Sequence, residues 1–469
     1  MPTSNNSAST ASSRAGGDGA FLRLRRLLED NPLLLAAVLL TVMAMLLAVV
    51  TASAARPAKQ DVDHESMLIA ADLLGIRADQ GWQLGAPGYP MIVAAVARVD
   101  PSVEAAVACH ANKVPCAAAA AFATLIGLQY VMAIVTLIVA LLLAYRLSGG
   151  WETAILTLLL TFLGSRLGAY AGSVSALIWI VSGTYLYLAL SVEAYRRASM
   201  ALAFSAGVMA AAVALLYPLA AIVPPILAMT IFVALRKTSF ARRLAVAVAL
   251  LVGAGSVALA FHAYGPTAYD PNAAGRLLVL QLSERLGYQA MGFHDWLGSL
   301  ILPLPFLGGW LEFLFSEDTA RRLAHGYAAL GREEIFPRAV AQSPLPFVQY
   351  AWLVRAYIEQ AFGSYLAVTP GILNRGVWGG ADIVALVGVF HIKRLLAYSA
   401  ADARCGALAM VLAPIFALLV VNTLLSANPA WANAAMPFVW AYAIAYVVAR
   451  FPSADAEPVI APHSGAPDR

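Results

Sequence analysis

Four residues that could transfer protons or hold a metal ion stand close together near the start of the chain. They are two aspartates, a histidine and a glutamate: Asp61, Asp63, His64 and Glu65. A carboxylate can act as a general base, because it accepts the proton of a hydroxyl group that attacks another atom. We take Asp63 as the first candidate base and Asp61 as the second. Carboxylate oxygens also bind Mg²⁺ or Mn²⁺, and any such ion would be held by Asp61, Asp63 and Glu65.

Arginines further along the chain could bind an anionic group beside these acids. The candidates are Arg166, Arg355 and Arg375. Arginine suits this task because its N–H groups match the oxygens of a phosphate in pairs. Two of them have a structural alternative: Arg166 could extend to the membrane interface, and Arg355 could pair with Glu359 four residues later on a helix.

Two cysteines, Cys109 and Cys116, are separated by six residues, one of which is a proline. This spacing favours a local disulfide on the oxidising side of a membrane. A metal site that also used His110 is the alternative, but two sulfurs and one imidazole leave zinc short of ligands. The chain has no phosphate-binding loop, zinc-protease motif or dinucleotide fingerprint, so these enzyme classes have no support.

The elements that must position these residues are membrane helices. Of the 469 residues, 61% are hydrophobic and only 12% are charged, a balance that a water-soluble protein of this size could not cover with polar surface. We therefore predict an all-α polytopic membrane protein with about ten to twelve transmembrane helices. The net charge of +4 comes from basic residues beside apolar runs, which is typical of cytoplasmic loops and speaks against nucleic-acid partners.

The basic residues recur after every second apolar run, which predicts cytoplasmic N- and C-termini. The transmembrane domain covers 20–453, and polar segments at 1–19 and 454–469 are expected to be disordered. The predicted spans are 32–53, 117–145, 152–171, 173–193, 199–217, 219–235, 244–263, 380–397, 405–425 and 433–450.

The stretch 264–379 has two interpretations. It contains two apolar runs, 296–315 and 344–369, and the parity of the spans requires that both cross the membrane or that neither does. If both cross, the total is twelve. We favour the second interpretation, ten spans, in which 264–379 is one extracytoplasmic region that carries interfacial helices.

Residues 54–116 form the first extracytoplasmic loop in this topology. Two stretches within it, 64–75 and 88–98, are apolar at helical spacing, which predicts helices along the membrane surface.

The segment 61–90 resembles the first extracytoplasmic loop of the GT-C superfamily of membrane glycosyltransferases, which includes lipid A aminoarabinose transferases and protein O-mannosyltransferases. In that family an acidic pair follows the first span, then come an aromatic residue, a surface helix and a Tyr-Pro turn. Here Asp63 stands at the acidic position, and Pro87-Gly88-Tyr89-Pro90 match the turn. His64 replaces the usual second acid, with Glu65 one place later, and Met67 stands where an aromatic is common.

The resemblance implies an enzyme that moves a sugar from a polyprenyl-phosphate donor to a glycolipid, polysaccharide or protein acceptor. It places the protein in a bacterial inner membrane with its active face in the periplasm. Substrate binding would fall to Glu65, His64, Tyr89 and the three arginines, although Tyr89 could instead be an interfacial anchor. The alternatives are an O-antigen ligase or polymerase, which would depend on Arg355 and Arg375, and a lipid or solute transporter.

Overall fold

The chain folds into helices throughout the residues that the computed structural model describes. These residues are 31–54, 63–76, 86–112, 122–164, 167–235, 238–264, 273–301, 315–316, 318–319, 322–360, 405–425, 438–439 and 441–446. Within them there are seventeen α-helices and no sheet, so the predicted all-α class is confirmed. The polar segments at the two ends of the chain and the predicted span 380–397 lie outside the described residues.

Three described helices are long and apolar enough to cross a membrane: α6 (Ala123–Ser148), α9 (Leu177–Arg197) and α12 (Phe240–Tyr264). A bilayer core about 30 Å thick takes roughly 20 helical residues, and each of these helices supplies that length. They coincide with three of the apolar runs in the sequence. The prediction of membrane-length helices is therefore confirmed for these three.

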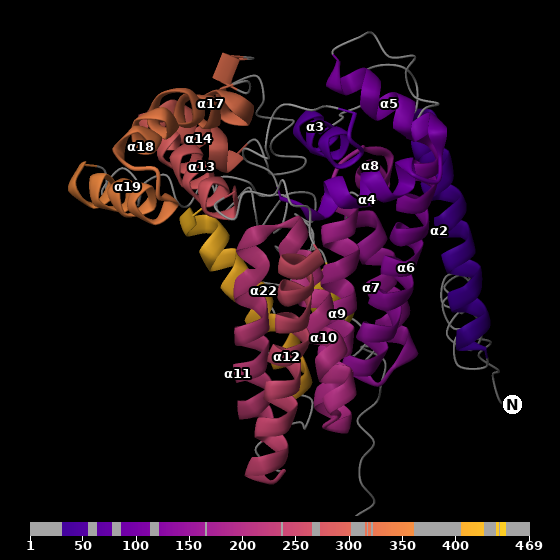
Figure 1. Ribbon diagram of the computed structural model, residues 1–469. Helices are drawn as coiled ribbons and strands as arrows, with labels where there is room; N and C mark the ends of the chain where they lie inside the picture. The colour runs from indigo at the N-terminus through magenta and orange to yellow at the C-terminus, as the bar shows by residue number, and fades with distance from the viewer. Residues whose placement is uncertain are drawn as a thin grey trace, which may run out of the picture.

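Other helices pack beside these three to form a bundle whose axes run side by side (Figure 1). One hydrophobic core, from Ala36 to Tyr446, joins them. The predicted span 152–171 is divided in the structure into α7 and α8, and the span 219–235 begins as a 3₁₀ turn. The additional bundle elements are α2 (Pro32–Ala54), α7 (Trp151–Gly164), α8 (Leu167–Gly172), α10 (Met200–Leu216), η2 (Pro218–Ile222), α11 (Val223–Ala234) and α22 (Cys405–Leu425).

Two glycines allow α10 and α12 to pack backbone against backbone. A Cβ on Gly207 would overlap the carbonyl oxygen of Leu250, and a Cβ on Gly253 would overlap that of Phe204. Small residues at such crossings are typical of helix pairs in membranes, where close van der Waals packing replaces the hydrophobic effect. The position of α12 in the bundle thus depends on both glycines.

The first loop carries three helices at one end of the bundle: α3 (His64–Leu73), α4 (Gly88–Ala97) and α5 (Pro101–Ala111). The first two match the helices predicted at 64–75 and 88–98, whereas α5 was not predicted. Met67, Tyr89 and Val103 of the three helices share a small core of their own. Asp63 and Asp100 cap the N-termini of α3 and α5 with their side chains, which is the preferred role of aspartate at that position.

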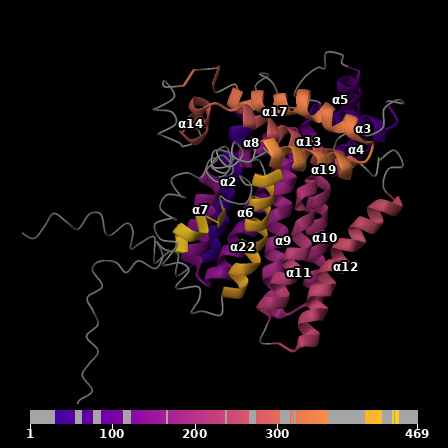
Figure 2. The same ribbon diagram turned by 90° about the vertical axis from the view of Figure 1, so that its left-hand side faces the viewer.

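A second group of helices, which we call the head, comprises the described residues between 273 and 360. The head lies at the same end of the bundle as α3 to α5 (Figures 1 and 2). Neither of the two apolar runs in this region forms a helix of spanning length in the described residues, since α14 has 9 residues and α19 has 15. The elements of the head are α13 (Ala273–Gly287), η3 (Tyr288–Ala290), α14 (Phe293–Ile301), η5 (Arg322–Gly326), α17 (Tyr327–Leu330), η6 (Gly331–Ile335), α18 (Phe336–Gln342) and α19 (Pro346–Gln360).

Candidate functional site

Asp63, the first candidate base, is fixed at the start of α3 by three hydrogen bonds. Its Oδ1 accepts from the backbone N–H of Ser66 at 3.3 Å, and its Oδ2 accepts from the Ser66 hydroxyl at 2.6 Å. Its own backbone N–H donates to the carbonyl oxygen of Val174 at 3.1 Å. A carboxylate has about four acceptor positions, so two remain for another donor. The side chain is half-buried.

A buried pair of polar side chains, Tyr89 and Gln129, lies close to this acid. Their side chains are 1% and 0% exposed. Gln129 Nε2 lies 3.5 Å from the Tyr89 hydroxyl oxygen and donates to the carbonyl oxygen of Ser175 at 3.3 Å. Burial, together with the negative charge of Asp63, raises the pKa of Tyr89 above its ordinary range. Tyr89 therefore stays protonated, and its burial excludes the interfacial-anchor interpretation.

Gln129 was not identified from the sequence. Its side-chain oxygen is buried, and no hydrogen-bond donor among the described residues reaches it. A buried acceptor in this state costs free energy of about 1–3 kcal/mol, so it is a feature that calls for a ligand or a water molecule. The sequence offered one sign of this residue's role, which is that a polar glutamine stands within the apolar run 117–145.

An apolar cavity of about 400 Å³ opens on the other side of α4 from the loop core. It lies between α4, α6, α9 and α10, and the indole N–H of Trp179, which lines it, is buried without a hydrogen-bond partner among the described residues. Because Tyr89 also belongs to α4, the cavity and the polar pair are adjacent along one helix. The lining residues are Gly88, Met91, Ile92, Ala95, Met132, Trp179, Gly183, Met209, Ala212, Val213, Leu215 and Leu216.

The other residues of the predicted acidic cluster are only partly described. Asp61 lies outside the described residues, and His64 and Glu65 begin α3 but their side chains are not described. Within the described residues no three histidine, cysteine, aspartate or glutamate side chains come together as a metal site. Asp63 is thus the one member of the cluster whose side-chain contacts the structure provides.

Of the three predicted anion-binding arginines, only Arg355 is described. It is exposed on α19, which lies on the far side of the head from α3 (Figure 1). The structure therefore does not bring Arg355 to Asp63. Arg166 and Arg375 lie outside the described residues.

Arg285, which the sequence reading missed, is a fully buried cation at this end of the bundle. It shares a face of α13 with Gln281 and Leu278, and Leu278 packs against the bundle core. Arg285 thus lies on the side of α13 that faces the bundle. A charged side chain is rarely buried completely unless it is paired, so the burial of Arg285 is a structural feature that its charge alone does not predict.

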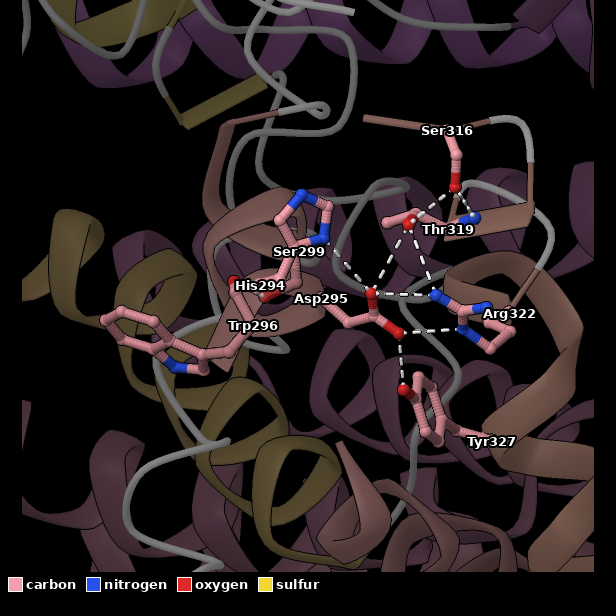
Figure 3. A network of polar contacts seen from close by, with 8 residues as sticks. All are labelled: His294, Asp295, Trp296, Ser299, Ser316, Thr319, Arg322 and Tyr327. Atoms are coloured by element: carbon pink, nitrogen blue, oxygen red, sulfur yellow. Dashed lines mark hydrogen bonds and ion pairs between the residues drawn. The ribbon is translucent and has the colours of Figure 1, made fainter. Parts of the chain in front are cut away.

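A second polar network surrounds Asp295 in the head (Figure 3). Its side chain is 8% exposed and accepts hydrogen bonds from Arg322 at 2.9 and 3.1 Å, from the Tyr327 hydroxyl at 2.6 Å and from the Thr319 hydroxyl at 3.3 Å. His294 Nδ1 lies 3.5 Å from Asp295 Oδ1. The network joins α14 to η5 and α17.

The contacts of Asp295 explain its ionisation. The hydrogen bonds from Arg322 hold the pKa of the Asp295 carboxyl well below its ordinary value. Burial and the hydrogen bond to Asp295 raise the pKa of Tyr327 to about 12. A carboxylate with this many donors is a poor base, because each donor favours its ionised form. The network therefore serves to hold the head together.

Cys109 is disulfide-bonded, and Cys116, the partner expected from the sequence, lies outside the described residues. The ring of His110 lies against that of Phe122, with centroids 5.8 Å apart, so an aromatic contact accounts for its position.

No family model matches the chain, and a search of curated proteins finds no similar sequence.

Proposed function

We propose that this protein is a membrane glycosyltransferase of the GT-C type. In this proposal it transfers a sugar from a polyprenyl-phosphate donor to an acceptor on the extracytoplasmic side, and Asp63 is the base. The observation that carries the proposal is the position of Asp63: a fixed carboxylate next to a buried polar pair and, across α4, next to an apolar cavity. A donor with a polar head and an apolar tail needs both environments side by side.

The chemistry follows from these positions. The Asp63 carboxylate takes the proton of the acceptor hydroxyl, whose oxygen attacks the anomeric carbon of the sugar. The bond between that carbon and the phosphate oxygen breaks, and the polyprenyl phosphate leaves with the electron pair. In this proposal Arg285, which is buried in α13, supplies the guanidinium that stabilises the negative charge of the leaving phosphate. The isoprenoid chain would enter the apolar cavity.

The positions of the basic residues support an orientation in which the candidate site lies on the extracytoplasmic side of the membrane. Arg146 ends α6, Arg197 ends α9 and Arg242 begins α12, all at the end of the bundle opposite α3 to α5. Arginines in short loops are retained on the cytoplasmic side. We therefore place the loop helices and the head on the extracytoplasmic side, with both termini in the cytoplasm and ten spans.

The deciding experiment compares two aspartates that have the same structural role. Purified full-length protein in lipid would be given a synthetic polyprenyl-phosphate donor with a labelled sugar and a set of candidate acceptors. Asp63→Asn should lower the transfer rate by a factor of about 10²–10⁴, whereas Asp100→Asn, which alters the N-cap of α5 in the same loop, should leave it unchanged. Retained transfer by Asp63→Asn would remove Asp63 from the mechanism.

Arg285 is tested separately by donor binding. Polyprenyl phosphate without a sugar should bind the wild type and bind Arg285→Gln more weakly by tenfold or more, with partial recovery in Arg285→Lys. Arg332→Gln is the matched control, because Arg332 is exposed and paired with Glu284 at 2.6 Å. Loss of transfer in Arg355→Ala but not in Asp63→Asn would instead favour the ligase or polymerase.

A further inference from the structure

Helix α19 and the turn before it expose large apolar side chains on one side. Phe347 is 81% exposed and Ile358 is 61% exposed, and Leu345 and Val348 are also exposed. Single exposed apolar residues are common on protein surfaces, but several along one helix mark an interaction surface. This apolar side of α19 is the feature that calls for a partner.

The orientation of α19 is fixed by its contact with α13. Gln349 and Leu353 are buried, and Leu353 belongs to the core that joins α13, α18 and α19. A Cβ on Gly275 of α13 would lie 2.8 Å from Pro346, so the start of α19 lies directly against α13. At 100° per residue, Phe347, Ala351 and Ile358 lie on the opposite side of α19 from the buried pair. The apolar side therefore faces away from α13.

The stacking of the head gives the direction in which this side points. Along the bundle axis α17 lies outermost, α13 beneath it and α19 nearest to the bundle helices (Figure 2). In the other view α19 extends sideways beyond the bundle, level with its end (Figure 1). The face of α19 away from α13 thus points outward from the head, and the helix lies beside the end of the bundle rather than on top of it.

We propose that α19 lies in the outer surface of the bilayer, with Phe347, Ala351 and Ile358 inserted among the lipid chains. Arg355, at the edge of this apolar side, would lie at the level of the lipid headgroups, where its long side chain can reach their phosphates. The exposed charges of η6, Arg332, Glu333 and Glu334, belong to the outer layer of the head and stay in water. The proposal concerns lipid contact alone and does not depend on the glycosyltransferase reaction.

Spin labels at single cysteines test the proposal in the full-length protein. Labels would replace Phe347 and Ile358, with Glu333 as the water-exposed control and Leu142, exposed on α6, as the lipid-exposed control. The protein would carry Cys405→Ser, keep its disulfide and be reconstituted in phosphatidylethanolamine and phosphatidylglycerol vesicles. Both replaced α19 side chains are exposed, so the substitutions do not disturb the core.

The collision rates of each label with dissolved oxygen and with a water-soluble nickel complex give its environment. Labels at 347 and 358 should collide more with oxygen than with nickel, as the label at 142 does, and the label at 333 should show the reverse. Nickel collisions at 347 and 358 that equal those at 333 would place α19 in water and overturn the proposal. Protection from both reagents would also overturn it, because another protein segment would then cover this side.

Discussion

The backbone N–H of Asp63 donates a hydrogen bond to the carbonyl oxygen of Val174, 3.1 Å away. This bond ties the first residue before α3 to the connection between α8 and α9, far later in the chain. Because it uses backbone atoms only, a substitution of the Asp63 side chain leaves it in place. The position of residue 63 and the chemistry of its side chain can therefore be tested separately.

Asp63→Ala should lower the free energy of unfolding by about 0.5–2 kcal/mol, the usual loss for an N-cap side chain. Asp63→Asn should cost less, because the amide oxygen still accepts from the Ser66 N–H. Thermal unfolding of the purified variants in detergent measures the difference. If the two variants were equally unstable, the charge of Asp63 rather than its capping bond would be stabilising α3.

Gly253→Ala and Gly207→Ala should each destabilise the protein by about 1–3 kcal/mol, because the added methyl group would push α10 and α12 apart. The matched control is Gly255→Ala on the same helix, where a Cβ would meet no atom within 4 Å. That change should be neutral or stabilising by up to about 1 kcal/mol. Unfolding temperatures of the three variants provide the measurement. Equal effects at 253 and 255 would contradict the close crossing.

Stability should fall in acid because of Asp295. Its pKa in the folded protein lies below the ordinary value, since Arg322 favours the ionised form. A carboxyl group whose pKa is lowered by folding stabilises the fold at pH values above its pKa in the unfolded chain. This contribution to the free energy of unfolding is lost as the pH falls through the pKa in the folded protein, and the loss starts at about pH 5. Asp295→Asn should be less stable than the wild type at pH 7, and the difference in the free energy of unfolding between the two proteins should narrow toward pH 3. A gap that stayed constant with pH would refute this account.

Tyr327 should give the opposite pH dependence. Its pKa is raised to about 12. Its contribution to the free energy of unfolding is therefore complete below about pH 10 and is lost as the pH rises toward 12. Tyr327→Phe removes the hydroxyl that donates to Asp295 at 2.6 Å and should lower the free energy of unfolding by about 1–3 kcal/mol at pH 7. The alkaline loss that the wild type shows should be smaller in this variant.

Peptide mapping without reduction should recover Cys109 in a cross-linked peptide, because it is disulfide-bonded. The sequence predicts Cys116 as its partner. Reduction before digestion should separate the two peptides and serves as the control. A cross-link from Cys109 to Cys405 would contradict the topology, since the sequence places Cys405 at the cytoplasmic start of a late span.

The bundle was predictable because a span requires a long apolar run, which the sequence displays directly. The predicted span 199–217 and the observed α10, Met200–Leu216, differ by one residue at each end. The division of 152–171 into α7 and α8 was not predicted, although Gly164, Ser165 and Arg166 interrupt the apolar run at that point. Hydropathy therefore located helices better than their interruptions.

The head was much less predictable than the bundle. Helix α13 contains Arg276, Glu284 and Arg285 within 15 residues, a pattern that reads as a solvated segment, yet Arg285 is completely buried. Its burial depends on α17 to α19 covering one side of α13 and the bundle lying on another. Contacts between segments far apart in sequence decide this arrangement, and no local pattern records them.

The candidate site was partly predictable. Asp63 and Tyr89 were chosen by residue type and position, and the structure places them near each other. Gln129 and the apolar cavity were missed, because both depend on how α4 packs against α6, α9 and α10. Arg355 was chosen for its charge and lies elsewhere, at the edge of the head.

The single core of the bundle has a consequence for biosynthesis. Ala36 of the first described helix and Ala407 of α22 belong to the same core, and Leu278 of the head packs against it. A nascent chain that has inserted only its early helices therefore exposes unfilled helix surfaces inside the bilayer until α22 emerges from the ribosome. We expect the insertion machinery to shield these surfaces, and a chain that stops before α22 to be a substrate for membrane proteases rather than a smaller working protein.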